Sequence, residues 1–397
     1  MNGNEKLNIL VVGAGMYVCG RGTSGYGTVL PALCEWRRRG LPLGEVFLAA
    51  TRPESISYAR QRLDSLNELM GTDLALRTFP DDEEGRDPES YMLALREISR
   101  PACAIVVVPD HLHCKVAGDC LKAGAHTLVV KPLAPTVKEA RELISLQEKH
   151  GVYGAVEFHK RFDRANLKLK EVLGQEKLGD PLYFIVEFSQ RKSVPSKVFE
   201  SWVKESNIFQ YLGVHYVDII YFATGAVPRR VMALGQTGWL RDHGIDTYDA
   251  VHGTIEWEGP NGKTFLSHIF TNWIDPESTS AMSDQRIKVI GTKGRYESDQ
   301  KRRGIEMVTD ETGVEEPNPD FCSTYPGGSG TVSYQGYGIE SLLTFIRDVI
   351  ELNQNRITIE QLESVRPTFR DTLASTAVVE SVNKSLAQSG AWVEVVY

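Results

Sequence analysis

The sequence predicts a two-part chain: a doubly wound α/β domain with a parallel sheet, then an α+β domain with an open-faced, mostly antiparallel sheet. Three observations support this prediction. Short, continuous apolar runs alternate with amphipathic stretches from residue 7 to about residue 158. After that point, apolar and polar residues alternate within the strands. At 397 residues the chain is also long for one hydrophobic core, so we expect domains at 1–157 and 158–397.

Six apolar runs in the first part have the character of buried parallel strands. They are LNILVV, EVFLAA, LALRTF, CAIVVVP, HTLVV and VYGAVEF, which begin at residues 7, 45, 74, 103, 126 and 152. Continuous runs of this length suit strands that are covered on both faces. Gly71, Gly124 and Gly151 end the helical stretches between them, because glycine readily adopts the conformation that closes a helix. The acidic stretch 81–90 is expected to be an exposed loop.

The second part shows the alternation of half-buried strands. In VHGTIEWE, Val251, Ile255 and Trp257 share one face, and polar residues share the other. Similar patterns occur at 182–188, 264–273 and 286–298. We therefore expect a mostly antiparallel sheet with one covered and one open face. Two long helical patterns, near 338–354 and 359–386, follow the sheet.

Composition and charge exclude several classes of protein. With 42% hydrophobic and 24% charged residues, the chain is typical of soluble globular proteins. A net charge of -8 and the lack of a long basic run argue against nucleic-acid and membrane partners. The six cysteines form no C-x-x-C pair, and the sequence shows neither a signal peptide nor an apolar stretch of membrane-spanning length. We expect a cytoplasmic protein with reduced thiols.

The stretch VVGAGMYVCGRGTSGYG after the first strand begins like a phosphate-binding turn. Gly13 and Gly15 suit the tight turn and the close backbone approach of a G-x-G-x-x-G motif, but Val18 replaces its third glycine. Because the next apolar helical pattern follows Gly27, we interpret MYVCGRGTS as an insertion, with Gly25 or Gly27 in the third role. The alternative is a glycine-rich surface loop. The strand and helix on either side favour binding of a dinucleotide pyrophosphate.

Thr51 and Arg52 follow the second strand, where a carboxylate usually binds the adenosine ribose. A guanidinium binds phosphate oxygens in a fork, so Arg52 favours NADP(H) over NAD(H). The alternative is that Arg52 only covers the adenine face.

Three further motifs follow in order: VVVPDHLHCKVA, LVVKPLAPT and FQYLGVHYVDII. Together with the glycine turn they resemble the Gfo/Idh/MocA family of NAD(P)-dependent oxidoreductases along essentially the whole chain. The resemblance implies a Rossmann domain joined to an open-faced antiparallel sheet. The substrate that we expect is a sugar, a sugar derivative or a cyclitol. We also expect a homodimer or homotetramer formed through the open sheet.

The match to the family motifs is incomplete. The positions that fit are Pro109, His113, Lys131, Pro132, Gly213, His215 and Asp218. Asp110 replaces an Asn, Val130 replaces a Glu, and Tyr211 replaces an Asp. In the family that Asp, the Lys and the His surround the reacting carbon. Tyr211 therefore leaves the proton-transfer assignment and the shape of the substrate open.

Oxidation of a secondary alcohol requires a base for the hydroxyl proton and a donor that stabilises the alkoxide. We expect His215 to be the base or acid, because imidazole titrates near neutral pH. Lys131 ends a strand and is expected to bridge a nicotinamide ribose hydroxyl and the substrate oxygen. Tyr211 precedes His215 by four residues, so on a helix the two share a face, with Tyr211 as a phenolic relay. The first two motifs, with Pro109, His113 and Pro132, would line the cofactor.

Other candidates have weaker signals. Arg161, Asn272 and Trp273 are candidate substrate contacts, and Asp218 either orients His215 or balances local polarity. His111 and His113 are two residues apart, but no Cys, Asp or Glu set completes a site, so we expect no metal.

Two other functions stay open. An NAD-dependent glycoside hydrolase would oxidise C3 transiently and recycle its cofactor. A nucleotide-sensing regulator would have lost catalysis, with Tyr211 and Val130 as signs of decay. Retention of Lys131 and His215 argues against the regulator.

Overall fold

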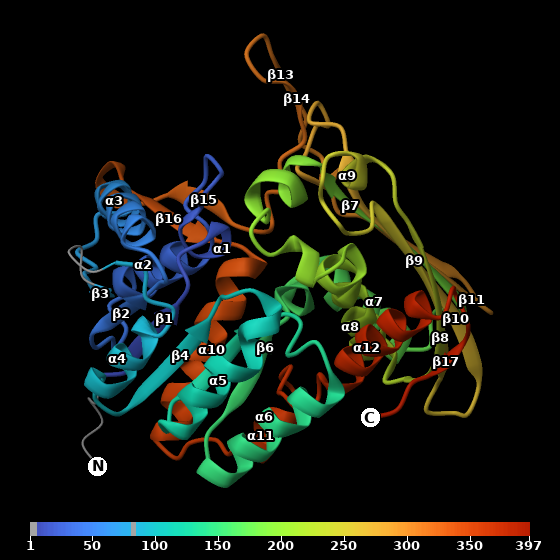
Figure 1. The fold of residues 1–397 in the computed structure, drawn as a ribbon, viewed down its shortest axis with the longest axis horizontal. Helices are drawn as coiled ribbons and strands as arrows, with labels where there is room; N and C mark the ends of the chain where they lie inside the picture. Colours follow the sequence, from blue (N-terminus) through green and yellow to red (C-terminus); the bar gives the residue numbers. More distant parts are fainter. Residues whose placement is uncertain (1–5, 81–84) are drawn as a thin grey trace. The chain divides into compact units, whose positions relative to one another are not determined.

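The computed structural model describes residues 6–80 and 85–397 and divides into two compact units (Figure 1). The first unit is made of the chain up to Leu133, Glu139–His159 and Asp320–Asp371. The second is made of Ala134–Lys138, Lys160–Pro319 and Thr372–Tyr397. The first four residues of the expected acidic loop, 81–84, and the N-terminal residues before Lys6 lie outside the described residues.

The first unit contains a six-stranded parallel sheet in the order β3-β2-β1-β4-β5-β6. Its strands are β1 (Asn8–Val12), β2 (Val46–Ala49), β3 (Leu76–Phe79), β4 (Ala102–Val106), β5 (His126–Val130) and β6 (Gly154–Glu157). The helices of the crossovers are α1 (Met16–Cys19), α2 (Val29–Arg38), α3 (Pro53–Met70), α4 (Ser90–Glu97), α5 (His113–Lys122) and α6 (Val137–His150). This strand order is that of the doubly wound dinucleotide-binding fold. The predicted parallel sheet is confirmed.

The second unit contains a seven-stranded sheet in the order β12-β11-β7-β10-β9-β8-β17. Its strands are β7 (Pro181–Arg191), β8 (Val227–Gln236), β9 (Ala250–Glu258), β10 (Thr264–Asp275), β11 (Ser283–Gly291), β12 (Arg295–Asp299) and β17 (Val393–Glu394). All neighbouring strands are antiparallel except β7 and β10. Burial alternates along β9 and β10, which confirms a mostly antiparallel sheet with one covered face.

The described residues of the second unit also form four α-helices. They are α7 (Arg164–Gly174), α8 (Val214–Thr224), α9 (Trp239–Asp242) and α12 (Leu373–Ala387). Helix α12 packs against β8 of that sheet and against α8, and α7 packs against α8. The π-helical turn η5 (Phe209–Gly213) packs against β9 and β10. In the part of the chain that the structure describes, no helix has the length and apolar character that crossing a membrane requires.

Residues 320–371 return to the first unit, although the sequence analysis assigns everything after residue 157 to a second domain. Helix α10 (Tyr337–Asn353) packs against α2, and Leu342, Leu343 and Ile346 on α10 are buried in the core of that unit. The apolar pattern predicted the helix but not its packing partner. That residues 1–157 form a domain by themselves stays a prediction.

The predicted helix at 359–386 is wrong, because it is two helices, α11 (Ile359–Glu363) and α12. Pro367 lies between them, and a proline has no amide hydrogen to continue a helix. Its carbonyl oxygen instead accepts a hydrogen bond from the Val156 amide on β6, at 2.8 Å. Pro367 in the sequence predicts this break between the two helices.

Candidate active site

Gly13 and Gly15 shape the turn that follows β1. Gly13 has a φ of 113°, and a Cβ atom there would lie 2.0 Å from the Val107 carbonyl oxygen. Only glycine fits this backbone conformation without strain. At Gly15 no atom lies within 4 Å of the Cβ position, so the space in front of the backbone is open. A turn of this shape fits a pyrophosphate that approaches the main chain closely.

The long helix of this crossover, α2, begins at Val29, after Gly27, as expected, and the inserted stretch contains one additional helical turn, α1. Val18 is fully buried on this short helix. Gly27 has a φ of 75°, and its Cβ would lie 2.7 Å from the Val18 carbonyl carbon. At Gly25 the nearest atom would be 3.9 Å away. Gly27, and not Gly25, therefore makes the close backbone contact in the inserted loop.

Arginines from two segments lie at the end of β2. Arg52 is the exposed residue that directly precedes α3, next to Thr51. The guanidinium of Arg21, in the inserted loop, donates a hydrogen bond to the Ser55 hydroxyl in the first turn of α3. The sequence analysis does not single out Arg21, although this residue stands between two glycines of the inserted loop. This end of β2 therefore carries two cations.

His113 is buried between the ends of β4 and β5. Its Nδ1 lies 2.7 Å from the Pro132 carbonyl oxygen and its Nε2 lies 2.9 Å from that of Val108. Burial lowers the pKa of His113. The ring joins the backbone that follows two neighbouring strands and thereby fixes the segment that carries Lys131. His113 is in this structure a positioning residue for that segment.

The remaining residues of the first motif hold the local backbone. Pro109 precedes a short 3-10 helix, Asp110–Leu112, and the carboxylate of the buried Asp110 accepts a hydrogen bond from the His111 amide at 2.9 Å. Among residues 6–80 and 85–397, no group of three His, Cys, Asp or Glu side chains is arranged to hold a metal ion.

Tyr211 and His215 lie in the second unit, on the segment that runs from η5 into α8. Burial of the phenol oxygen raises the pKa of Tyr211 to about 12, and the neighbouring Gln190 side chain opposes the rise. The buried His215 ring has its centroid 6.2 Å from that of Phe188. Phe188 and Gln190 are two residues apart on β7, so their side chains share a face. Both candidate proton-transfer groups therefore approach the same face of β7.

Arg161 and Asp218 form a buried pair within the second unit. Arg161 donates from Nε to Oδ2 of Asp218 at 2.8 Å and from Nη2 to Oδ1 at 2.6 Å. Their side chains are 6% and 0% exposed. This geometry commits the Arg161 guanidinium to the carboxylate on α8. The pair balances the charge of Asp218, which is in line with one of the two roles considered for this residue.

Asn272 and Trp273 lie on opposite faces of β10. Trp273 is fully buried, its Nε1 donates to the Tyr248 carbonyl oxygen at 2.6 Å, and its ring centroid lies 6.3 Å from that of Tyr211. The half-buried Asn272 lies on the open face and accepts a hydrogen bond from the Ile274 amide. The two side chains therefore do not contact one ligand together, since strand neighbours point in opposite directions.

Lys160 is a functional candidate that sequence reasoning missed. Its Nζ lies in the core of the second unit, where it donates to Oε1 of Gln300 at 3.1 Å and to Oε1 of Gln285. The ammonium also lies 5.0 Å from the centroid of the Phe188 ring, which flanks His215. Burial lowers the pKa of Lys160 to about 7. The only signal in the sequence was its place beside Arg161 in FHKRF.

The parallel sheet and its glycine turn define a dinucleotide-binding fold, and comparison with known families identifies an oxidoreductase. Residues 72–158 match the oxidoreductase family with an NAD-binding Rossmann fold, and residues 166–297 match the GFO/IDH/MocA C-terminal domain. The chain belongs to the Gfo/Idh/MocA family of oxidoreductases, which confirms the resemblance of its motifs.

Similar proteins include dehydrogenases of cyclitols. The chain is 26% identical to myo-inositol 2-dehydrogenase of Thermotoga maritima over 74% of its own length and 80% of that protein. It is 24% identical to the uncharacterized oxidoreductase YrbE of Bacillus subtilis, over 54% of its own length and 60% of YrbE. The fold also resembles that of scyllo-inositol dehydrogenase from Lactobacillus casei, solved with bound NAD(H) and scyllo-inositol. There the TM-score is 0.67 at 16% identity, over 98% of this chain and 99% of that chain.

Proposed function

We propose that this chain is an NAD(P)-dependent dehydrogenase that acts on a CH–OH carbon of a cyclitol, a sugar or a sugar derivative. The observation that carries the proposal is the approach of Tyr211 and His215 to one face of β7, at Gln190 and Phe188. The similarity to proteins named inositol dehydrogenases supports the substrate class.

The cofactor would bind to the first unit. Gly13 and Gly15 would meet the pyrophosphate, and the end of β2 would meet the adenosine ribose. When bound, the nicotinamide accepts or donates the hydride. The cations Arg52 and Arg21 favour a ribose 2′-phosphate, because guanidinium groups form charge-assisted hydrogen bonds with phosphate oxygens. We therefore propose NADP(H) as the preferred form.

The residues of the second unit would handle the proton. A phenol whose pKa is raised to about 12 keeps its proton at neutral pH, so Tyr211 would donate a hydrogen bond to the substrate oxygen. His215 would take the hydroxyl proton, since an imidazole changes its protonation near neutral pH. Lys131 would stabilise the developing alkoxide with its positive charge.

The test is a screen with myo-inositol, scyllo-inositol and glucose, with NAD and NADP in parallel, in which the absorbance of the reduced nicotinamide is followed. The expected result is net reduction of the cofactor with at least one polyol, strongly diminished in a His215→Asn variant. Cleavage of aryl glycosides without net reduction would favour the glycoside hydrolase instead. Binding of the nucleotide with neither reaction would favour the regulator.

A further inference from the structure

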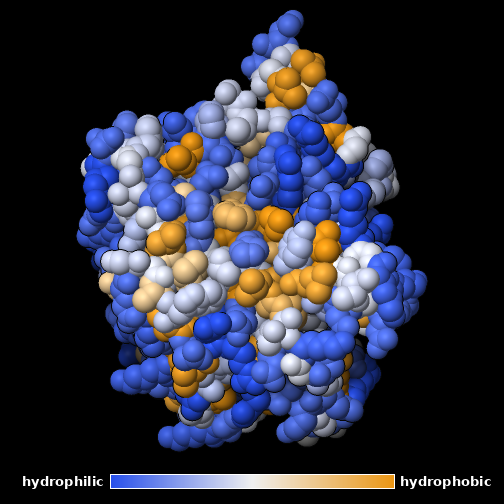
Figure 2. All heavy atoms as spheres, turned by 90° about the vertical axis from the view of Figure 1, so that its right-hand side faces the viewer, coloured by the Kyte–Doolittle hydropathy of each residue, from blue (hydrophilic) through white to orange (hydrophobic). Residues whose placement is uncertain are grey.

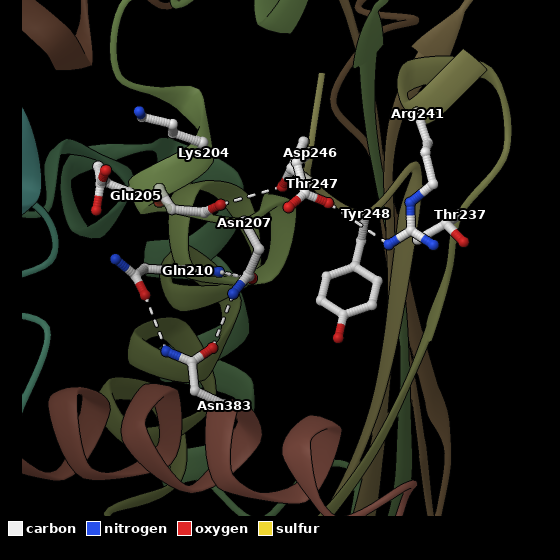
Figure 3. A pocket seen from close by; sticks show the side chains of 11 residues that line it. Lys204, Glu205, Asn207, Gln210, Thr237, Arg241, Asp246, Thr247, Tyr248 and Asn383 are labelled. Atoms are coloured by element: carbon white, nitrogen blue, oxygen red, sulfur yellow. Dashed lines mark hydrogen bonds and ion pairs between the residues drawn. The ribbon is translucent and has the colours of Figure 1, made fainter. Parts of the chain in front are cut away.

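A polar pocket of about 340 Å³ lies entirely within the second unit. It is formed by the segment that leads into η5, the loop between β8 and β9, and α12 (Figure 3). Its volume is within the range of small-molecule sites, about 300–1,000 Å³. Neither His215 nor Tyr211 lines it. The Trp273 indole lies between the two regions, because it bonds to the Tyr248 carbonyl and stacks near Tyr211.

The inner wall of this pocket consists of three carboxamide side chains in a hydrogen-bonded chain. Asn207 Nδ2 donates to Oδ1 of Asn383 at 2.7 Å, and Asn383 Nδ2 donates to Oε1 of Gln210 at 3.0 Å. The backbone N–H of Gln210 in turn donates to Oδ1 of Asn207 at 3.0 Å. Each NH₂ group carries two hydrogens, and these bonds use one from Asn207 and one from Asn383. The second hydrogens have no partner among the described residues, so they remain for a ligand.

Tyr248 forms the opposite wall. Its ring packs directly on the backbone of Gly235, where a Cβ atom would lie 2.4 Å from a ring carbon. Figure 3 shows its hydroxyl directed into the hollow, on the side of Asn383. Within residues 6–80 and 85–397 this hydroxyl has no hydrogen-bond partner. The loop around it is preformed, because the buried Asp249 carboxylate accepts hydrogen bonds from the Trp239 and Leu240 amides at 2.7 and 2.9 Å.

The charges at the rim of the pocket cancel. Arg241 lies 3.5 Å from Asp246, and the exposed Lys204 is followed directly by Glu205. All four line the pocket. An anionic ligand would meet as many carboxylates as cations, and so would a cationic one. The carboxamides, together with the hydroxyl and the ring of Tyr248, instead suit a ligand with several uncharged hydroxyl groups and an apolar ring face.

We propose that this pocket is a second ligand site, separate from the site of hydride transfer, that binds an uncharged polyhydroxylated small molecule. The carboxamides of Asn207 and Asn383 and the hydroxyl of Tyr248 are its recognition groups. The site is joined to the catalytic segment, because the Tyr211 amide donates to the Asn207 carbonyl oxygen at 2.9 Å. A ligand bound in the pocket therefore stabilises η5, the turn that leads into α8 and His215.

Calorimetric titration of the full chain without nicotinamide tests this site, with myo-inositol, glucose and inorganic phosphate as probes. Two variants change the pocket: Tyr248→Phe removes only the hydroxyl, and Asn383→Leu removes the carboxamide. Gln388→Leu is the matched control, because it makes the same kind of change at an exposed position at the end of the same helix. His215→Asn separates the pocket from the catalytic site. Thermal unfolding shows which variants are folded.

The expected result is saturable binding of myo-inositol or glucose, weakened about fivefold to tenfold in Tyr248→Phe, as the loss of one hydrogen bond predicts. Asn383→Leu should bind more weakly still, and Gln388→Leu and His215→Asn should bind like the wild type. Binding to His215→Asn would persist even if the chain catalysed no hydride transfer. Absence of saturable binding by either neutral probe, binding of phosphate alone, or binding abolished by His215→Asn but not by Tyr248→Phe would overturn the proposal.

Discussion

Arg161 holds the Asp218 carboxylate through two hydrogen bonds, at 2.8 and 2.6 Å, in the interior of the second unit. Replacing Arg161 with Met deprives the buried carboxylate of this cation, and breaking a buried pair costs about 3–5 kcal/mol. We expect a loss of that size in the free energy of unfolding, measured in urea. Arg229→Met is the control: its pair with Glu258 is largely exposed, so the loss should stay below about 1 kcal/mol. Equal losses in both variants would contradict the assignment.

Arg52 is predicted to set the choice of cofactor. Arg52→Asp removes a phosphate-binding cation and adds an acceptor for ribose hydroxyls, so the preference should move towards NAD. A charged hydrogen bond is worth about 1.5–3 kcal/mol, so the ratio of kcat/KM values for NADP and NAD should fall roughly tenfold or more. Arg21→Ala should weaken NADP binding while leaving NAD binding near the wild-type value. If the ratio of kcat/KM values for NADP and NAD is unchanged in both variants, the two arginines do not set a preference for NADP.

His215 is predicted to transfer the substrate proton. His215→Asn should lower turnover by roughly 10²-fold or more, the usual contribution of general acid or base catalysis, with cofactor affinity little changed. Tyr211→Phe tests the phenolic relay separately through the pH profile of kcat. Near-wild-type turnover in His215→Asn with an intact pH profile would move the assignment to Tyr211 and Lys131.

Lys160 is predicted to make stability depend on pH. Burial lowers its pKa in the folded chain from 10.5 to about 7. Between these pH values the unfolded chain holds a proton that the folded chain lacks, so the contribution of Lys160 to stability rises as pH increases. Below about pH 7 Lys160 is protonated in both the folded and the unfolded chain, and the full cost of burying its charge lowers the free energy of unfolding. The free energy of unfolding of the wild type, relative to Lys160→Met, should therefore increase from pH 7 to pH 9. A difference that does not change with pH would argue against a buried amine at this position.

The open face of the second sheet is predicted to join copies of the chain. Leu234, His252 and Phe270 form a row across β8, β9 and β10, and Leu234 and Phe270 are 48% and 41% exposed. Figure 2 shows apolar atoms gathered on the side on which Figure 1 draws these strands. Phe270→Glu should convert a dimer or tetramer to a smaller species in sedimentation, whereas Leu167→Glu, an exposed change on α7, should not. A wild-type monomer would contradict this prediction.

The sequence was most informative where local pattern determines the structure. Continuous apolar runs located β1 and β4 because a polar side chain on a strand covered on both faces is costly unless it is hydrogen-bonded. Alternation at 251–258 located β9 for the complementary reason. The same alternation would have separated Asn272 from Trp273, since adjacent strand residues face opposite ways.

Other features depend on contacts between residues far apart in the chain, which no local pattern reports. Val18 occupies the place of a glycine because Gly27, nine residues later, makes the close approach. Lys160 can be buried because Gln285 and Gln300, 125 and 140 residues later in the chain, accept its hydrogen bonds. Arg161 pairs with Asp218, 57 residues later in the chain, a contact that the sequence around Arg161 does not indicate.

The return of residues 320–371 to the first unit has a consequence for how the chain matures on the ribosome. The six parallel strands are synthesised first. Helix α10, which packs against α2, is synthesised only after residues 160–319. Until then the apolar side of α2 is a surface that a chaperone can hold. An N-terminal fragment that ends near residue 158 lacks α10, whose Leu342, Leu343 and Ile346 belong to the same core.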